Sequence, residues 1–149
     1  GIGTDVVEVA RIHESIEKFG NTFARRILSD SEFESYLKSS TQSRFLAKRF
    51  AAKEAFAKAL GTGFRSPVRF QNIIVGHDDL GKPILKFDDE LRSYLKEKNI
   101  NTVIPIKSTG KSGLIFWEFL FGQRRKRCDF LGSLGRHCLQ VLIRRGRRG

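Results

Sequence analysis

The sequence alternates predicted helices and short strands, a pattern that agrees with an α+β fold. Residues 42–60 repeat apolar side chains and alanines at helical spacing, which predicts a long helix with a buried stripe. The first nine residues are rich in β-branched side chains and predict a strand. Residues 71–76 and 84–87 predict two more strands, joined by a turn that contains Gly and Pro.

Two further helices are predicted in the first forty residues. Apolar side chains recur on one side of residues 9–19, as in a helix that packs on a core. Ser29 and Glu32 have the spacing of a capping box, so a short helix should follow and run to about residue 37.

Residues 88–121 continue the alternation of predicted helices and strands. Asp88 is placed to cap a helix that runs to about residue 98. Residues 101–107 predict a strand, and Pro105, which cannot donate to a sheet ladder, favours an edge position for it. Residues 113–121 supply a last, unusually bulky strand.

The long helix is the part of the sequence with chemical character. Glu54 and Lys58 lie four residues apart, so their side chains project about 5 to 6 Å from each other. Gly61 should end the helix in a left-handed conformation, and Gly61-Thr62-Gly63 leaves room for a phosphate. The simpler interpretation is a solvated ion pair followed by an ordinary cap. Asp5 interrupts the first strand, which otherwise has a buried character, and therefore needs a partner.

Two separated motifs carry a family resemblance. The chain opens as G-x-G-x-D-x-x-x-x-x-R, and residues 49–63 follow the pattern R-F-A-A-K-E-A-x-x-K-A-x-G-T-G. In this order and spacing they resemble the holo-(acyl carrier protein) synthase family, the small phosphopantetheinyl transferases, over residues 1 to about 101. The resemblance implies transfer of phosphopantetheine from coenzyme A to a serine of apo acyl carrier protein, in support of fatty acid synthesis. It also implies the α+β fold of these transferases, a small antiparallel sheet with helices packed on one side.

The resemblance implies a magnesium site. Asp5 and Glu54 match the metal ligands of the family, and Mg²⁺ prefers hard oxygen ligands while keeping water and substrate phosphate in its shell. Lys58 matches the lysine suited to neutralise charge on the transferred group. Glu54, directly or through a metal-bound water, is the nearest candidate base for the serine hydroxyl.

Other family positions imply contacts with coenzyme A and with the carrier. Arg49 is expected near the nucleotide end, where a guanidinium grips phosphate or stacks on a base; Lys53 binds the cofactor or is only a solvated neighbour. Gly61, Thr62 and Gly63 complete the expected cofactor-binding set.

Basic residues near the start are expected to face the acidic carrier. Arg11, Arg25 and Arg26 match the positions that the family uses for docking, although three arginines are unremarkable in a basic protein. The resemblance also implies a homotrimer with sites between subunits.

Composition bounds the rest. A chain of 149 residues is one domain that needs no disulfide or metal to support its core. No apolar run is long enough for a membrane span, and no signal peptide is evident. Cys128 and Cys138 do not make a disulfide framework, which favours a reducing, cytoplasmic setting. His13 and His77 have no second His or Cys near them in sequence, so zinc is not expected.

The net charge of +12 is unevenly placed. Residues 1–107 hold 18 basic and 14 acidic side chains, whereas residues 108–149 hold 10 basic and 2 acidic ones. The basic residues also change from mostly Lys to mostly Arg, so we divide the chain into a transferase-like body, 1–107, and an atypical Arg-rich segment, 108–149. Residues 101–108 lack the polar side chains that the family carries in this strand.

Two explanations of the C-terminal segment remain open. Everything after about residue 102 derives from a shifted reading frame or another foreign C-terminus, or the segment is a real appendage. As an appendage, residues 123–127 and 144–148 would bind nucleic acid or an anionic membrane, with Trp117 for stacking or insertion. The alternative function is therefore a basic binding module on an inactive scaffold. Asp5, Glu54 and Lys58 favour the transferase, since a binding module has no need of them.

Overall fold

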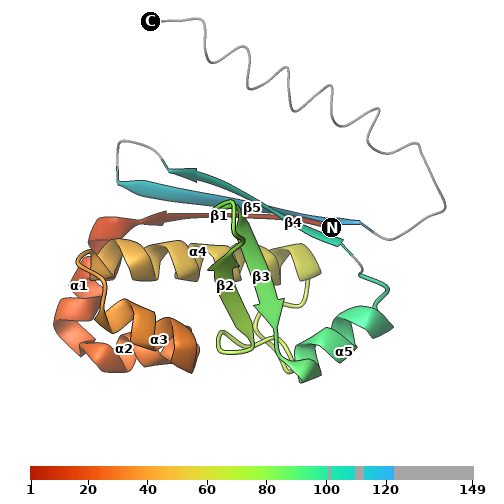
Figure 1. The fold of residues 1–149 in the computed structure, drawn as a ribbon, viewed down its shortest axis with the longest axis horizontal. Helices are drawn as coiled ribbons and strands as arrows, with labels where there is room; N and C mark the ends of the chain where they lie inside the picture. The colour runs from red at the N-terminus through yellow and green to blue at the C-terminus, as the bar shows by residue number, and fades with distance from the viewer. Residues whose placement is uncertain (101, 110–112, 123–149) are drawn as a thin grey trace, which may run out of the picture.

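The computed structural model describes residues 1–100, 102–109 and 113–122. Its elements, in chain order, are β1 (Ile2–Glu8), α1 (Val9–Phe19), α2 (Asn21–Ile27), α3 (Asp30–Leu37), α4 (Gln42–Leu60), β2 (Ile73–His77), β3 (Pro83–Phe87), α5 (Asp89–Glu97), β4 (Thr102–Thr109) and β5 (Leu114–Gly122). Helix α4 lies at the centre, with a sheet along one side of it and the shorter helices on the other (Figure 1). This arrangement confirms the predicted α+β class.

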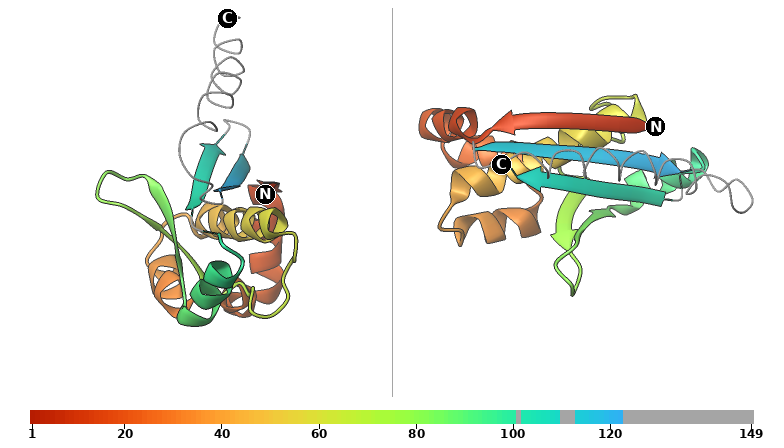
Figure 2. Two further views of the ribbon diagram at one scale, coloured as in Figure 1. Left: turned by 90° about the vertical axis from the view of Figure 1, so that its right-hand side faces the viewer. Right: turned by 90° about the horizontal axis from the view of Figure 1, so that it is seen from above.

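The main sheet has the strand order β1-β5-β4 and is antiparallel throughout. The last strand therefore lies in the middle, between the first strand and β4 (Figure 2). Pro105 is on β4, at the edge of the sheet as predicted. The register sets Gly3 opposite Phe119 and Asp5 opposite Trp117, so these four residues share one face.

The two faces of the sheet differ sharply. Gly3, Trp117 and Phe119 are buried on the face that packs on α4. Among the side chains that the structure describes on the other face, five large apolar ones are exposed, although apolar residues of this size are usually buried. They are Ile2 (65%), Val6 (55%), Leu114 (41%), Ile104 (41%) and Ile106 (40%).

Helix α4 is buried on almost every side because it is lined with small residues. Six of its alanines are buried, which lets the sheet and the other helices approach its backbone closely. The closest approach is at Gly3 of β1, where a Cβ atom would stand 2.2 Å from the Ala55 carbonyl oxygen and 2.2 Å from the Ala59 nitrogen. Only glycine fits at this point of contact.

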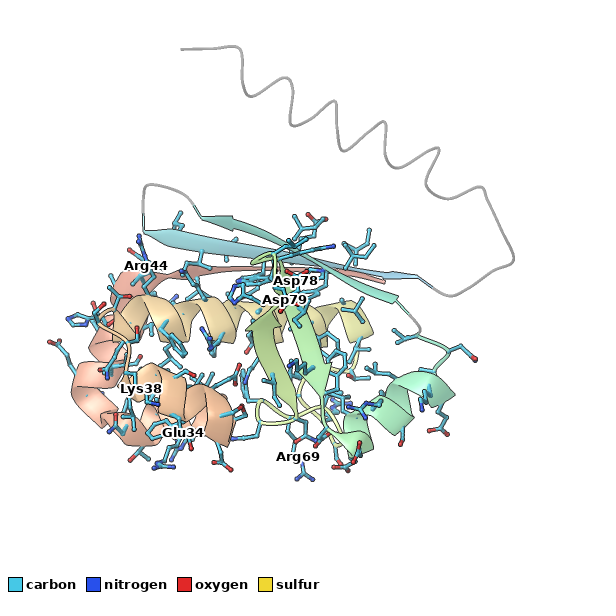
Figure 3. All side chains as sticks on the ribbon, viewed as in Figure 1. Glu34, Lys38, Arg44, Arg69, Asp78 and Asp79 are labelled. Atoms are coloured by element: carbon cyan, nitrogen blue, oxygen red, sulfur yellow. The ribbon has the colours of Figure 1, made fainter. Side chains whose placement is uncertain are left out.

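A separate two-stranded sheet, the hairpin of β2 and β3, lies beside α4 and leads into α5. Asp78 and Asp79 lie at its turn, and Arg69 lies near its opposite end (Figure 3). The strand predicted from residue 71 begins at Ile73 instead, because the hydrogen bonds of Asn72 go to loop residues and not to a partner strand. Its side chain donates to the Pro67 carbonyl, and its own carbonyl accepts from the Asp88 amide.

Several local predictions are confirmed. Ser29 and Glu32 form the capping box that begins α3, and the Asp88 carboxylate accepts from the Leu91 amide at the start of α5. Gly61 ends α4 with φ of 75°. The idea that Trp117 is an exposed stacking residue is wrong, since it is 1% exposed and stacks on Phe119. The basic clusters at 123–127 and 144–148, and Cys128 and Cys138, lie outside the described residues.

Candidate active site

The close contact of β1 with α4 brings Asp5 to Lys58. The Lys58 Nζ donates to the Asp5 Oδ1 over 2.6 Å, with the Asp5 side chain 12% exposed and that of Lys58 53% exposed. Asp5 points toward α4 because it lies on the same face of β1 as Gly3, two residues before it. Lys58 of α4 is therefore the partner that Asp5 was expected to need.

Glu54 lies one helical turn before Lys58 and joins this pair. Burial and then the nearby charge of Asp5 raise the pKa of Glu54, while Lys58 acts in the opposite direction. The expected helix-surface pair of Glu54 with Lys58 is thus only part of the arrangement. Two carboxylates share one ammonium, and the shortage of positive charge is what a divalent cation would correct.

Asp5 and Glu54 both line a hollow of about 450 Å³, which we call the Asp5 hollow. Arg11 of α1 lies at its wall, and Phe23 and Phe50 form part of its apolar side. Glu8 and Glu14 also line it, so acidic side chains outnumber the one guanidinium. A phosphate would therefore need a cation beside these carboxylates, while the apolar side suits an aliphatic part of a ligand.

The donor set fits a magnesium ion that also binds substrate oxygens. Within the described part of the chain, no three His, Cys, Asp or Glu side chains are grouped so that they alone hold a metal. Asp5 and Glu54 supply two hard oxygen ligands, and Mg²⁺ in such sites takes the remainder from water and phosphate.

The exit of α4 follows directly after Lys58. Gly61 and Gly63 both have positive φ, 75° and 60°, and an added Cβ on either would meet nothing within 4 Å. The Thr62 hydroxyl donates to the Gly63 carbonyl. This segment is therefore an open turn with accessible backbone, as its sequence predicted.

Arg49 lies elsewhere. Five residues separate it from Glu54, which places the two side chains about 140° apart around α4. Arg49 lines a second hollow of about 230 Å³, the Arg49 hollow, together with Phe45, Lys48 and Trp117. The two hollows share no lining residue. Burial lowers the pKa of Arg49, and the charge of Glu32 opposes that shift.

Lys53 requires a correction. It is fully buried, and its Nζ donates to the Ile27 carbonyl at 2.7 Å, the Phe70 carbonyl at 2.7 Å and the Glu32 Oε2 at 2.6 Å. An ammonium has three N–H donors, so none is left for a phosphate, and the side chain is not solvated either. Both expectations for Lys53 are wrong in this structure, and its role is to join elements in the core.

The three arginines expected to dock the carrier are divided between α1 and α2. Arg11 is exposed beside the Asp5 hollow. Arg25 and Arg26 are exposed in the last turn of α2, with the Arg25 guanidinium 4.0 Å from the centre of the Phe33 ring. All three are on the α1–α2 side of the molecule and accessible to a partner.

Comparison with known proteins decides the family. Residues 1–104 match the sequence profile of the 4′-phosphopantetheinyl transferase superfamily. The chain belongs to this superfamily. It is 54% identical over 100 residues to the holo-[acyl-carrier-protein] synthase of Nitrosomonas eutropha, covering 67% of this chain and 80% of that one. The enzyme of the same name from Dechloromonas aromatica is 45% identical over 116 residues, covering 78% and 93%.

Solved structures agree and reach further along the chain. The holo-[acyl-carrier-protein] synthase of Neisseria meningitidis matches with a TM-score of 0.78 and 43% identity, covering 82% of this chain and 97% of that one. The Helicobacter pylori synthase in complex with coenzyme A matches with a TM-score of 0.70 and 27% identity, covering 82% and 100%. The structural similarity therefore extends beyond the profile match that ends at residue 104.

Sequence reasoning missed three contributors to the site. Gly3 sets the distance between β1 and α4, and its place in the opening motif was the available signal. Glu32 was noticed only as a capping residue, yet its carboxylate also reaches Lys53 and Arg49. Trp117 lines the Arg49 hollow, which no pattern in the sequence indicates.

Proposed function

We propose that this chain transfers the 4′-phosphopantetheine group of coenzyme A to a serine of apo acyl carrier protein, with Mg²⁺ as cofactor. The observation that carries the proposal is the meeting of Asp5, Glu54 and Lys58 where β1 contacts α4. Relatives with 45% to 55% identity bear the name of this activity, and related structures hold coenzyme A.

Asp5 and Glu54 would hold the metal. Mg²⁺, when bound, would neutralise charge on the pyrophosphate oxygens of coenzyme A. Lys58, on the same side of the helix, would neutralise charge on the group that is transferred. Because Lys58 is half exposed, its ammonium is free to turn from Asp5 toward a bound phosphate.

The serine hydroxyl of the carrier loses a proton as it attacks phosphorus, and adenosine 3′,5′-bisphosphate leaves. Glu54 is the proposed acceptor, directly or through a water molecule. Its place in the Asp5 hollow, one helical turn from Lys58, supports this role. Gly61, Thr62 and Gly63 would admit the phosphates beside their exposed backbone.

Arg11, Arg25 and Arg26 would receive the acidic carrier. Their exposure on α1 and α2 lets them attract a negative helix before close contact forms, which increases the association rate and fixes orientation. Arg11 is the one that also borders the Asp5 hollow, so it would guide the serine to the metal side. We place the protein in the cytoplasm and in fatty acid synthesis on the basis of the same assignment.

We further propose a homotrimer with composite sites. The outer face of the main sheet exposes five large apolar side chains, a surface that an interface would cover. Arg49, the expected nucleotide contact, lines a hollow separate from that of Asp5 and Glu54. Both facts are explained if Arg49 of one subunit completes the Asp5 hollow of the next.

The alternative of a basic binding module is not favoured. Residues 1–104 match the transferase superfamily, and Trp117, the expected stacking residue of such a module, is buried among side chains of the core. No helix in the described part of the chain is both long and apolar enough to cross a membrane.

The test is an intact-mass assay. Purified protein is incubated with coenzyme A and an apo acyl carrier protein, with Mg²⁺ and in parallel with a chelator. The proposal predicts that the carrier gains the mass of phosphopantetheine on its serine only when Mg²⁺ is present. Folded protein that gives no mass gain with Mg²⁺ would contradict the proposed transfer.

A further inference from the structure

Glu32 is an acid in the core that the proposed chemistry does not use. Its side chain is 3% exposed. One oxygen, Oε2, accepts from the Lys53 Nζ at 2.6 Å and from the Ser29 amide at 3.0 Å. The other, Oε1, accepts from the Val75 amide at 2.9 Å and lies 3.7 Å from the Arg49 Nε. A single carboxylate thus joins α3, α4 and β2.

Lys53 holds the Glu32 carboxylate in place through a hydrogen bond. Its three hydrogen bonds, to Glu32 and to the Ile27 and Phe70 carbonyls, hold the ammonium in one place. Burial lowers the pKa of Lys53 to about 8, against the influence of Glu32, which raises it. The cluster is therefore a desolvated one that tolerates little rearrangement.

Arg49 is the third member and lines the Arg49 hollow. Phe45, Arg49 and Lys53 are spaced by four residues, so they lie on one side of α4. The Arg49 guanidinium carbon lies 3.4 Å from the centre of the Phe45 ring, and its Nε faces Glu32. The ring contacts the guanidinium, and the carboxylate attracts it electrostatically although the buried Nε makes no hydrogen bond; the Arg49 side chain keeps 13% exposure.

We propose that Glu32 and Lys53 are positioning residues that hold the Arg49 guanidinium toward its hollow for binding the phosphate end of coenzyme A. This inference rests on the proposed function. Glu32 is the shared counterion of Arg49 and Lys53 in the desolvated core. Loss of its negative charge would leave these two cations next to each other without that counterion. Arg49, which has a path to solvent, is the one that would turn away.

The test is Glu32→Gln in the full chain, which keeps the shape and removes the charge. We expect the KM for coenzyme A to rise by on the order of tenfold, and coenzyme A binding measured by calorimetry to weaken equally. We expect kcat and the KM for the carrier to change less than twofold, because Glu32 contacts Lys53 and Arg49 rather than Asp5, Glu54 or Lys58. Glu34→Gln is the matched control, since Glu34 is exposed on the same helix (Figure 3).

A double-mutant cycle separates positioning from general support of the fold. In an Arg49→Ala background, Glu32→Gln should have no further effect on the KM for coenzyme A. Independent, multiplying effects would overturn the inference, as would an equal loss in kcat. If Glu32→Gln does not fold, Glu32→Asp is the substitute, because it keeps the charge but moves the carboxylate away from Arg49. It should raise the KM for coenzyme A by a smaller factor, and this effect should also vanish in the Arg49→Ala background.

Failure of the proposed function would look different. In that case the unaltered protein and Glu34→Gln would neither bind coenzyme A in the calorimeter nor modify the carrier. If the unaltered protein binds coenzyme A and modifies the carrier, and Glu32→Gln has the same kcat, KM values and affinity for coenzyme A, only the positioning role is refuted.

Discussion

Replacing Gly3 by alanine tests the geometry on which the site depends. The new Cβ would lie 2.2 Å from the Ala55 oxygen and the Ala59 nitrogen, and 2.7 Å from the Ala59 Cα, all of them backbone atoms of α4. Backbone cannot turn aside as a side chain can, so β1 must retreat by roughly 1 Å to restore ordinary contact. Such overpacking costs about 1–3 kcal/mol. For a domain of this size that lowers Tm by about 2–4 °C per kcal/mol.

The same retreat moves Asp5, which is two residues along β1. The 2.6 Å contact with Lys58 would lengthen, and a misplacement of about 1 Å at a reacting centre can reduce the rate by about 100-fold. We therefore expect Gly3→Ala to lose far more activity than its modest loss of stability explains. Thermal unfolding by circular dichroism and the transfer rate, measured well below both Tm values, give the two quantities.

Gly76→Ala is the matched control. It is also a strand glycine, but the nearest atom to its added Cβ is the Ile84 Cγ1 at 3.7 Å, an ordinary contact. We expect it to keep the Tm and the transfer rate of the unaltered protein. If Gly3→Ala behaves like Gly76→Ala in both measurements, the proposed role of the β1–α4 contact is incorrect.

Three other predictions follow from single contacts. Burial and Asp5 raise the pKa of Glu54 in the folded state, so Glu54 stabilises the fold below the usual glutamate pKa and this contribution is lost as pH rises through the raised value. Near neutral pH the charged Glu54 therefore destabilises the fold, and Glu54→Gln should raise Tm. A lower Tm of Glu54→Gln at that pH would contradict this. Lys58→Gln removes the cation that competes for Asp5, so Mn²⁺ affinity without coenzyme A, measured by electron paramagnetic resonance, should rise severalfold while transfer falls; unchanged affinity would count against the competition. Val6→Glu places a charge on the apolar outer face. If the proposed trimer forms through this face, light scattering should show trimers of the unaltered protein and monomers of the variant; trimers of the variant would exclude this face as the interface.

Local signals predicted the elements well. The helix over residues 42–60, its Gly61 cap and the Ser29 capping box were all legible, because helix periodicity and end signals act within a few residues. The resemblance implied that Asp5 and Glu54 belong to one site, and both line the Asp5 hollow; the ion pair of Asp5 with Lys58 was not predicted. The implied grouping of Asp5 with Glu54 depended on two distant segments in one pattern rather than on either alone.

The roles of the lysines and Arg49 on α4 were less accessible. A helix with one buried face reveals which charges are exposed, but α4 is covered on almost every side, so position on the helix did not distinguish buried Lys53 from exposed Lys58. Only the tertiary structure shows that Lys53 meets Glu32, 21 residues away. The separation of Arg49 from Glu54 depends on which elements cover each side of the helix.

The C-terminal third shows the limit of motif reasoning. Residues 113–121 look unlike the family, yet β5 is the central strand of the main sheet. Backbone pairing and alternation of inward residues suffice for this, and Trp117 and Phe119 provide the inward bulk. The hypothesis of a shifted reading frame stays a prediction, which sequencing of the encoding DNA would test.

The most direct test of the account is the magnesium-dependent transfer rate of Asp5→Ala and Glu54→Ala beside the unaltered protein. Intact-mass analysis of the carrier serine gives the rate, and circular dichroism establishes that each variant is folded. The account predicts that both folded variants lose transfer at every Mg²⁺ concentration, because each lacks one of the two carboxylates at the β1–α4 contact. Full activity in both variants would contradict the assignment of the metal site.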